Sequence, residues 1–189
     1  MKRLPLAAAF FTVALALAES PDPKAAKVEK TLNQIQEDQY SENGSGNSYM
    51  IQEDELNAYL KALIEVQQPE GLDSARVRLD GSRRFTTWLE VDLDQLDLEK
   101  SGAGWLSYIL TGKRTMQVEG RLETSQGRGS YTVIEAWMGS VPIPASLVNS
   151  AIKQVGEKQD PPFDPTKSFD LPYGLRDIEV MKGQAVLSN

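Results

Sequence analysis

The residue types that most often perform catalysis are either absent from this chain or lack their usual companions. The sequence contains no histidine and no cysteine, which removes Ser–His and Cys–His nucleophile pairs and nearly all zinc and copper sites. One nucleophile pattern is left, Ser150-Ala-Ile-Lys153, whose spacing places both side chains one helical turn apart. The Ser-Asp-Asn and Lys-Thr-Gly elements that accompany this pattern in enzymes are missing, so an amphipathic helix surface explains it better.

Carboxylates offer the second route to chemistry, as an acid–base pair or as calcium ligands. Asp92, Asp94 and Asp97 fall on or just beyond the polar side of a strand, and Glu53-Asp54-Glu55 opens a helix. Solvation and the helix dipole explain both placements. The aspartates lack the glycine turn and terminal glutamate of a calcium loop, and no glycine segment leads into the Gly-Lys-Ser/Thr of a phosphate loop. We therefore expect no catalytic activity, no metal and no cofactor.

The balance of charge argues against a nucleic acid partner. Without Lys2 and Arg3, 18 basic residues face 27 acidic ones, which gives a net charge of −9. A protein that binds the phosphate backbone needs a basic surface. Local basic clusters such as Lys113-Arg114 could still meet a lipid headgroup, although solvated strand faces and turns explain them as well.

The first eighteen residues have the composition of a cleavable export signal. Lys2 and Arg3 precede an apolar run that ends at Leu17, and Ala16-Leu17-Ala18 gives the small-x-small pattern of a cleavage site. The run is short for a ~30 Å hydrocarbon core, so cleavage is favoured over the alternative, an uncleaved membrane anchor. The lack of cysteine excludes lipidation of an N-terminal cysteine and suits a bacterial periplasm. We expect an exported periplasmic protein that is soluble after residues 1–18 are removed.

Residues 19–47 are expected to form an appended helix followed by a flexible linker. Asp22-Pro23 makes a helix start, and Ser41–Ser48 is rich in Gly, Ser and Asn, as flexible linkers are. The helix between them, Lys24–Tyr40, is polar apart from a narrow stripe. It could dock loosely on the main domain or on an envelope protein partner through three apolar side chains: Val28, Leu32 and Ile35.

Residues 48–189 are expected to form a single α+β domain. A brief strand at Tyr49–Ile51 leads into an amphipathic helix, Glu53–Val66. Apolar residues then recur with period two in four strands, which are joined by turns and interrupted by a short helical turn, Trp105–Leu110. The expected strands are 75–80, 85–94, 116–122 and 131–138. A second helix over 145–155 and a closing hairpin of 178–180 and 185–187 follow. Strands joined by hairpins imply an antiparallel sheet whose apolar face the helices must cover.

Apolar side chains exceed what a half-buried sheet ordinarily carries. They would line either a closed core or a groove able to admit an acyl chain. Taken alone, the residue types favour the closed core. The side chains in question lie around the expected sheet and its short helix: Phe85, Trp88, Trp105, Tyr131, Trp137 and Met138.

One segment resembles a known family. Ser48-Tyr-Met-Ile-Gln-Glu-Asp-Glu-Leu-Asn-Ala-Tyr-Leu60 resembles the opening strand and E-L-N-x-Y-L helix of the YceB-like bacterial envelope proteins, which are regarded as lipid-binding relatives of the TULIP-like fold. Strand patterns at 71–79, 91–94 and 178–187 also agree, less specifically. The resemblance implies a curved antiparallel sheet that wraps one long helix, with an apolar groove between them. Members of that family are typically lipoproteins, whereas this chain lacks the acylated cysteine and carries an additional helix, Lys24–Tyr40.

We therefore predict a non-catalytic periplasmic protein that binds a lipid or other hydrophobic ligand in an apolar groove between the sheet and the helices. The alternative is an envelope interaction or assembly module with a closed core. The apolar face of the sheet is wider than one short helix can cover, so both helices would have to close it. The expected lining is Leu56, Leu60, Ile64, Val77, Leu79, Phe85, Leu89, Val91, Leu93, Met116, Val118, Leu147 and Ile152.

The export signal yields a first prediction. N-terminal sequencing of the protein purified from a bacterial envelope should start at Glu19 or within a few residues of it, because signal peptidase recognises Ala16-Leu17-Ala18. Recovery of the chain with an intact Met1 in the membrane fraction would contradict cleavage.

Overall fold

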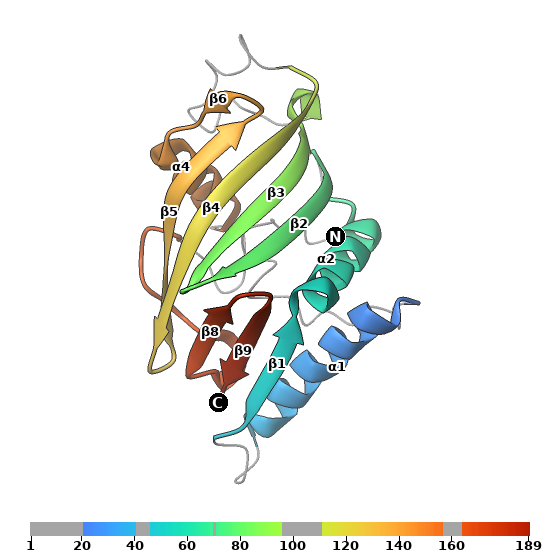
Figure 1. Ribbon diagram of the computed structural model, residues 1–189, viewed down its shortest axis with the longest axis vertical. Helices are drawn as coiled ribbons and strands as arrows, with labels where there is room; N and C mark the ends of the chain where they lie inside the picture. The colour runs from blue at the N-terminus through green and yellow to red at the C-terminus, as the bar shows by residue number, and fades with distance from the viewer. Residues whose placement is uncertain (1–20, 41–45, 70, 96–110, 157–163) are drawn as a thin grey trace.

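The protein is described by a computed structural model that covers residues 21–40, 46–69, 71–95, 111–156 and 164–189. Within these ranges the chain forms three α-helices, a large antiparallel sheet and a small one (Figure 1). The expected α+β class is confirmed. The export signal and the helical turn expected at Trp105–Leu110 lie outside the described residues.

The large sheet is a meander in which each strand pairs antiparallel with the next along the chain. Its strands are β2 (Leu72–Gly81), β3 (Arg84–Asp92), β4 (Lys113–Ser125), β5 (Arg128–Met138) and β6 (Val141–Pro142), and a short β7 (Phe169–Asp170) pairs with the start of β5. Alternation with period two puts the apolar side chains on one face, which we call the inner face. The opposite, outer face is mostly polar. The strand expected to run to Asp94 ends at Asp92, where a 3₁₀ turn, η2 (Leu93–Gln95), begins.

The small sheet joins the first and last strands of the main domain. Strand β1 (Ser48–Gln52) pairs with β9 (Gln184–Ser188), which pairs with β8 (Asp177–Met181). The predicted closing hairpin is present, but it forms a separate sheet with β1 and does not extend the meander. Two backbone hydrogen bonds tie the sheets together, from Gly183 N to Leu79 O at 2.9 Å and from Arg83 N to Val180 O at 3.2 Å.

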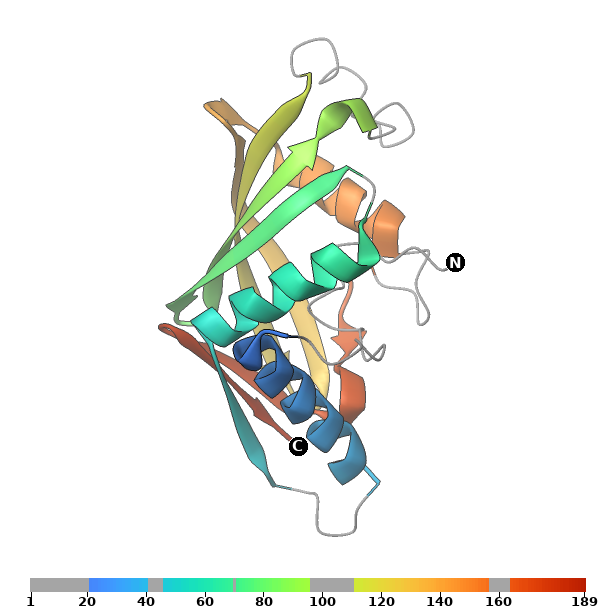
Figure 2. The same cartoon turned by 90° about the vertical axis from the view of Figure 1, so that its right-hand side faces the viewer.

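Two helices lie on the inner side of the large sheet (Figure 2). Helix α2 (Glu53–Gln67) follows β1 directly and packs along β2, whereas α4 (Ala145–Gly156) packs on β5. Helix α2 ends at Gln68, which adopts a left-handed φ of 43° and donates its N–H to Ile64 O at 2.8 Å. Among the described helices, none is both long enough and apolar enough to cross a membrane.

The N-terminal helix α1 (Pro23–Asp38) packs more tightly than the loosely docked helix expected from its composition. Its start is as predicted, because Asp22 Oδ1 accepts a hydrogen bond from Lys24 N at 2.8 Å. Ala25 and Ile35 are fully buried and Val28 is 2 % exposed. Val28 and Ile35 were expected to be available to a partner, but they are occupied within the chain and could be reached only if α1 left this position.

Ion pairs add to the contact between α1 and α2. Lys24 Nζ lies 2.8 Å from Asp54 Oδ2, and Lys27 pairs with Glu55. Burial acts to raise the pKa of Glu55, but the bonds from Lys27 and from the backbone N–H of Gln52 outweigh it and lower that pKa below its ordinary value. The carboxylate is therefore held in its charged form at the start of α2. We also predict that residues 48–189 fold without the segment 24–47, and this stays a prediction.

Side chains of α2 pair with the free edge of β2. This strand is the first of the large sheet, so one of its edges has no strand beside it. Val77 N donates to Asn57 Oδ1 at 2.7 Å, and Asn57 Nδ2 donates to the Val77 carbonyl at 2.8 Å. Glu53 accepts a bond from Leu79 N at 2.7 Å. Because Val77 and Leu79 are two residues apart, the helix satisfies consecutive edge-facing groups as a neighbouring strand would.

This arrangement predicts that Asn57→Leu lowers the free energy of unfolding by about 2–4 kcal/mol, since it leaves the N–H and C=O of Val77 without partners. Urea denaturation measures the loss, and hydrogen exchange at the Val77 amide should accelerate. Asn33→Leu, an exposed site on α1, serves as the matched control and should change little. An unchanged unfolding midpoint for Asn57→Leu would show that α2 does not depend on these bonds.

Candidate functional site

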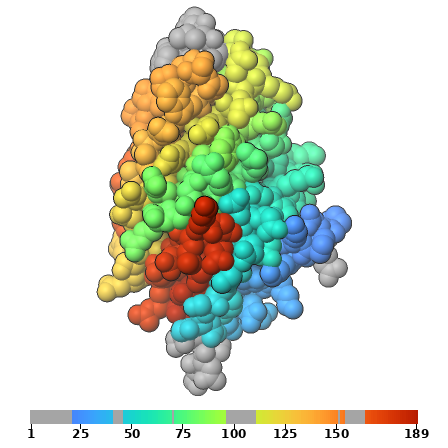
Figure 3. Space-filling model, viewed as in Figure 1, coloured from blue at the N-terminus to red at the C-terminus, as the bar shows by residue number. Residues whose placement is uncertain are grey.

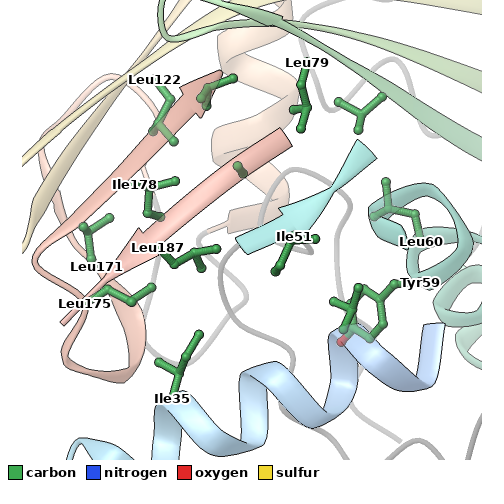
Figure 4. Close-up of a cluster of buried hydrophobic side chains, with 14 of the residues drawn as sticks. Ile35, Ile51, Tyr59, Leu60, Leu79, Leu122, Leu171, Leu175, Ile178 and Leu187 are labelled. Atoms are coloured by element: carbon green, nitrogen blue, oxygen red, sulfur yellow. The ribbon is translucent and has the colours of Figure 1, made fainter. Parts of the chain in front are cut away.

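The inner face of the large sheet holds two clusters of apolar side chains. The lower cluster joins α1, α2, the small sheet and the adjacent halves of the long strands (Figure 4). Its buried members are Ala25, Val28, Ile35, Ile51, Tyr59, Leu60, Leu63, Val77, Leu79, Leu122, Leu171, Leu175, Ile178, Val180, Ala185 and Leu187. The upper cluster lies against the other halves of the strands, beside η2 and α4. Its buried members are Leu72, Val91, Leu93, Val118, Val133, Ala136, Met138, Ile143 and Val148.

The thirteen side chains predicted to line one groove are divided between these clusters. Five belong to or pack against the lower cluster: Leu56, Leu60, Val77, Leu79 and Phe85. Eight belong to or pack against the upper cluster: Ile64, Leu89, Val91, Leu93, Met116, Val118, Leu147 and Ile152. The apolar surface read from the sequence is therefore one face of the sheet, but it is packed in two parts.

A pair of aromatic rings marks the boundary between the clusters. Phe85 packs against the lower cluster and Tyr131 against the upper one. Their rings are stacked, with centroids 5.9 Å apart and planes inclined by 27°. Gly120 makes room for them, because a Cβ at this position would lie 2.4 Å from Cε2 of Tyr131. The boundary thus depends on a glycine in the middle of β4.

Tyr131 contributes no charge to this boundary. Burial raises the pKa of Tyr131 to about 12, because the phenolate would lose its hydration among apolar neighbours. The hydroxyl is therefore protonated throughout the physiological pH range, and the ring behaves as a large apolar divider.

The lower cluster is closed. Figure 4 shows its side chains converging from α1, α2 and the small sheet, with Ile35 of α1 covering the side opposite the large sheet. Ile35 is fully buried, and Leu63 and Leu175 are each 2 % exposed. Side chains this completely enclosed form a packed core, and we assign no ligand to this half of the molecule.

The upper cluster is less completely covered. Nine buried side chains are accompanied by eight that are only partly buried, whereas the lower cluster has sixteen buried and eight partly buried. Helix α2 reaches it with its last turn, through Ile64, and α4 packs on β5. The inner face of β3 and β4, with Leu89 and Met116, thus lies between the two helices. The upper cluster is the candidate site.

The sequence missed part of this cluster because β5 contains a bulge. The register between β4 and β5 shifts at Glu119 and Gly120, so that Gly120 faces Val133 and Glu119 faces Glu135. Ile134 is the additional residue, and Val133 and Ala136 both become buried although they are three residues apart. Strict alternation cannot place Val133 and Ala136 on the same face. The only sign of the bulge in the sequence was that apolar residues occur on both faces of the expected strand.

Three of the polar residues considered for chemistry, Asp92, Asp94 and Lys153, have structural partners. Asp92 accepts bonds from Asp94 N at 3.2 Å and from Gln95 Nε2 at 2.7 Å, and Asp94 accepts one from Gly112 N at 3.0 Å. Lys153 Nζ lies 3.5 Å from Asp164 Oδ2. Asp97 lies outside the described residues. Within the described part of the chain, no group of three or more acidic side chains is placed to hold a metal ion.

The boundary between the clusters yields a further prediction. Gly120→Ala should lower the free energy of unfolding by about 1–3 kcal/mol, since the new methyl group overlaps the ring of Tyr131. In the Tyr131→Leu background the same change should cost at least about 1 kcal/mol less, because the overlap is gone. Urea denaturation of the four proteins of this cycle measures the difference.

Gly129→Ala is the control for that cycle. A Cβ there would lie 2.7 Å from Cε2 of Phe169, so its cost should not depend on Tyr131. Strict additivity of Gly120→Ala and Tyr131→Leu would contradict the proposed boundary.

Comparison with known proteins adds no assignment. No family model, no curated protein and no solved structure matches this chain. The similarity of Ser48–Leu60 to the YceB-like envelope proteins therefore stays a prediction. Function has to be argued from the geometry of the upper cluster itself.

Proposed function

We propose that the protein binds a lipid or another hydrophobic ligand at the upper cluster, without catalysing a reaction on it. The ligand would lie along the inner face of β3 and β4, between the last turn of α2 and α4. Leu89 and Met116 would form the floor, Ile64 one wall, and Leu147 with Ile152 the other. The Phe85–Tyr131 pair would limit how far an acyl chain reaches towards the lower cluster.

The observation that carries this proposal is the incomplete burial of an apolar surface. Ile64, Leu89, Met116, Leu147 and Ile152 come from four different elements, and each is only partly buried. Apolar area left accessible to water contributes nothing to folding, whereas burying it contributes about 25 cal/mol per Å². An acyl chain that covers these side chains would recover that free energy, which is the driving force for binding.

The upper end of β4 provides a cation near this surface. Arg114 is opposite Val91 in the register of β3 and β4, and it shares its side of the strand with Met116 and Val118. It is exposed and forms no ion pair among the described residues. Its neighbour Lys113 is occupied by Asp73, with Nζ 2.6 Å from Oδ2. Arg114 is therefore suited to the anionic end of an amphiphile whose chain lies on the apolar face, which favours fatty acids and phospholipids as first probes.

Oleate is a direct probe of this proposal. Its binding should raise the melting temperature, by an amount equivalent to about 2.7 kcal/mol when free oleate is at 100 times its dissociation constant. Ile64→Glu should abolish the shift, because it places a carboxylate on the apolar wall and beside the ligand. Differential scanning fluorimetry measures the melting temperature, and native mass spectrometry counts the bound ligand.

Val66→Glu is the matched control for Ile64→Glu. Both replace a β-branched residue near the end of α2 by glutamate, but the side chain of Val66 is 64 % exposed. Val66→Glu should retain the oleate shift of the unmodified chain. The proposal fails if neither oleate nor an anionic phospholipid shifts the melting curve, or if a folded Ile64→Glu protein responds as Val66→Glu does.

A further inference from the structure

Helix α4 encloses a polar atom beside the candidate site. The amide oxygen of Asn149, Oδ1, is buried and has no hydrogen bond partner. Among the described residues, the other buried side-chain atoms without a partner are the two amide atoms of Asn189, which follows β9. Buried polar side chains in folded proteins are hydrogen-bonded in the large majority of cases. The oxygen of Asn149 is therefore an acceptor for which the fold itself supplies no donor.

Helix geometry places Asn149 on the side of α4 that meets the upper cluster. Asn149 follows Ala145 by four residues and precedes Ile152 by three, so the three side chains lie along one side of the helix. Ala145 and Ile152 pack against the upper cluster, and Val148 is one of its buried members. Ser150, by contrast, is exposed. Helix α4 as a whole lies on the inner side of the large sheet (Figure 2), behind the strands that face the viewer in the space-filling view (Figure 3).

The charged group closest along the helix is already engaged. Lys153, the one charged residue of α4, lies one turn beyond Asn149, and its Nζ is 3.5 Å from Oδ2 of Asp164. The side chains that flank Asn149 on the same side of α4, Ala145 and Ile152, contain no polar atom. A donor for Oδ1 therefore has to come from a bound molecule.

An enclosed acceptor discriminates between ligands by their donors. The amide oxygen of asparagine accepts hydrogen bonds and cannot donate them. A ligand that donates to it satisfies a group whose desolvation was unfavourable in the free protein, whereas a ligand without a donor leaves that group unpaired. Sites built to hydrogen-bond a hydroxyl or an N–H therefore reject analogues that lack it.

We propose that Asn149 selects amphiphiles that carry a hydrogen bond donor at the head of their acyl chain. This inference rests on the proposed binding at the upper cluster and names the class of ligand taken there. A fatty acid that is ionised at neutral pH offers acceptors only. An N-acylated amino acid offers an amide N–H to Asn149 and a carboxylate to Arg114, so it matches both polar groups of the site.

Two probes that differ only at the amide nitrogen test this selection. N-Oleoylglycine has an amide N–H, whereas N-oleoylsarcosine has a methyl group in place of that hydrogen, with the same acyl chain and carboxylate. The unmodified chain should bind N-oleoylglycine at least about fivefold more tightly, because the methylated probe leaves Oδ1 without a partner. Isothermal titration calorimetry measures both dissociation constants.

Removal of the acceptor should abolish this preference. Asn149→Leu and Asn149→Ala should bind the two probes with dissociation constants within about twofold of each other. Without ligand, both variants should melt at a higher temperature than the unmodified chain, since no acceptor is left buried without a partner. Asn33→Leu makes the same exchange at an exposed site on a helix. It should keep the preference, and its melting temperature should rise less than that of Asn149→Leu.

These measurements separate selection of the ligand from binding itself. Equal affinity of the unmodified chain for the two probes would overturn the role of Asn149 and leave binding at the upper cluster intact. A preference that persists in both variants at position 149, or a melting temperature that both of them lower, would also overturn it. Binding of neither probe contradicts the selection, and if oleate causes no shift either, the proposed function fails with it.

Discussion

The arrangement of this protein depends on how the open edge of β2 is satisfied. A strand edge carries backbone donors and acceptors that must find partners, and here they find the side chains of Asn57 and Glu53. Those bonds fix both the position of α2 along the sheet and its rotation about its own axis. Since β1 runs directly into α2, the small sheet is positioned by the same contact. Helix α1 then has a fixed surface formed by α2 and the small sheet.

A second constraint divides the apolar face that α2 partly covers. The absence of a side chain at Gly120 lets the ring of Tyr131 lie across β4 and stack on Phe85. On one side of this pair the elements seal the core completely. On the other side two helices approach the sheet from opposite edges, and side chains between them are incompletely covered. The division separates a half of the sheet whose side chains are enclosed from a half whose apolar side chains are available to the ligand that we propose.

The features predictable from the sequence were those with local signals. The alternation of Phe85, Leu89 and Val91 with polar residues placed a strand correctly, and the apolar stripe through Tyr59 and Leu63 placed α2. The apolar face was identified as well, because period two assigns side chains to faces without knowledge of the partner strand. All thirteen predicted groove residues are buried or partly buried.

The features that escaped prediction depend on contacts between distant segments. No residue near Ile178 in the sequence indicates that the hairpin of β8 and β9 pairs with β1 in a separate sheet and does not join the meander. The division at Gly120 requires the register of β4 against β5, which a bulge at Ile134 alters. The apolar stripe on α1 has the same sequence pattern whether the helix is loosely attached or fully enclosed. Ala25, which completes the buried face of α1, is too small to contribute strongly to a hydrophobic pattern.

The pairing of β1 with β9 also affects the order in which the molecule can assemble. Ser48 is paired with Ser188, 140 positions further along the chain, whereas each of β2 to β5 pairs with the next strand along the chain. Closing so long a loop costs conformational entropy before any contact rewards it. The enclosed lower half of the protein therefore depends on the strand pairing with the largest sequence separation. The surface on which α1 packs is incomplete until β9 has paired with β1. The meander has no such dependence, so the sheet that carries the candidate site can form while the rest of the chain is still open.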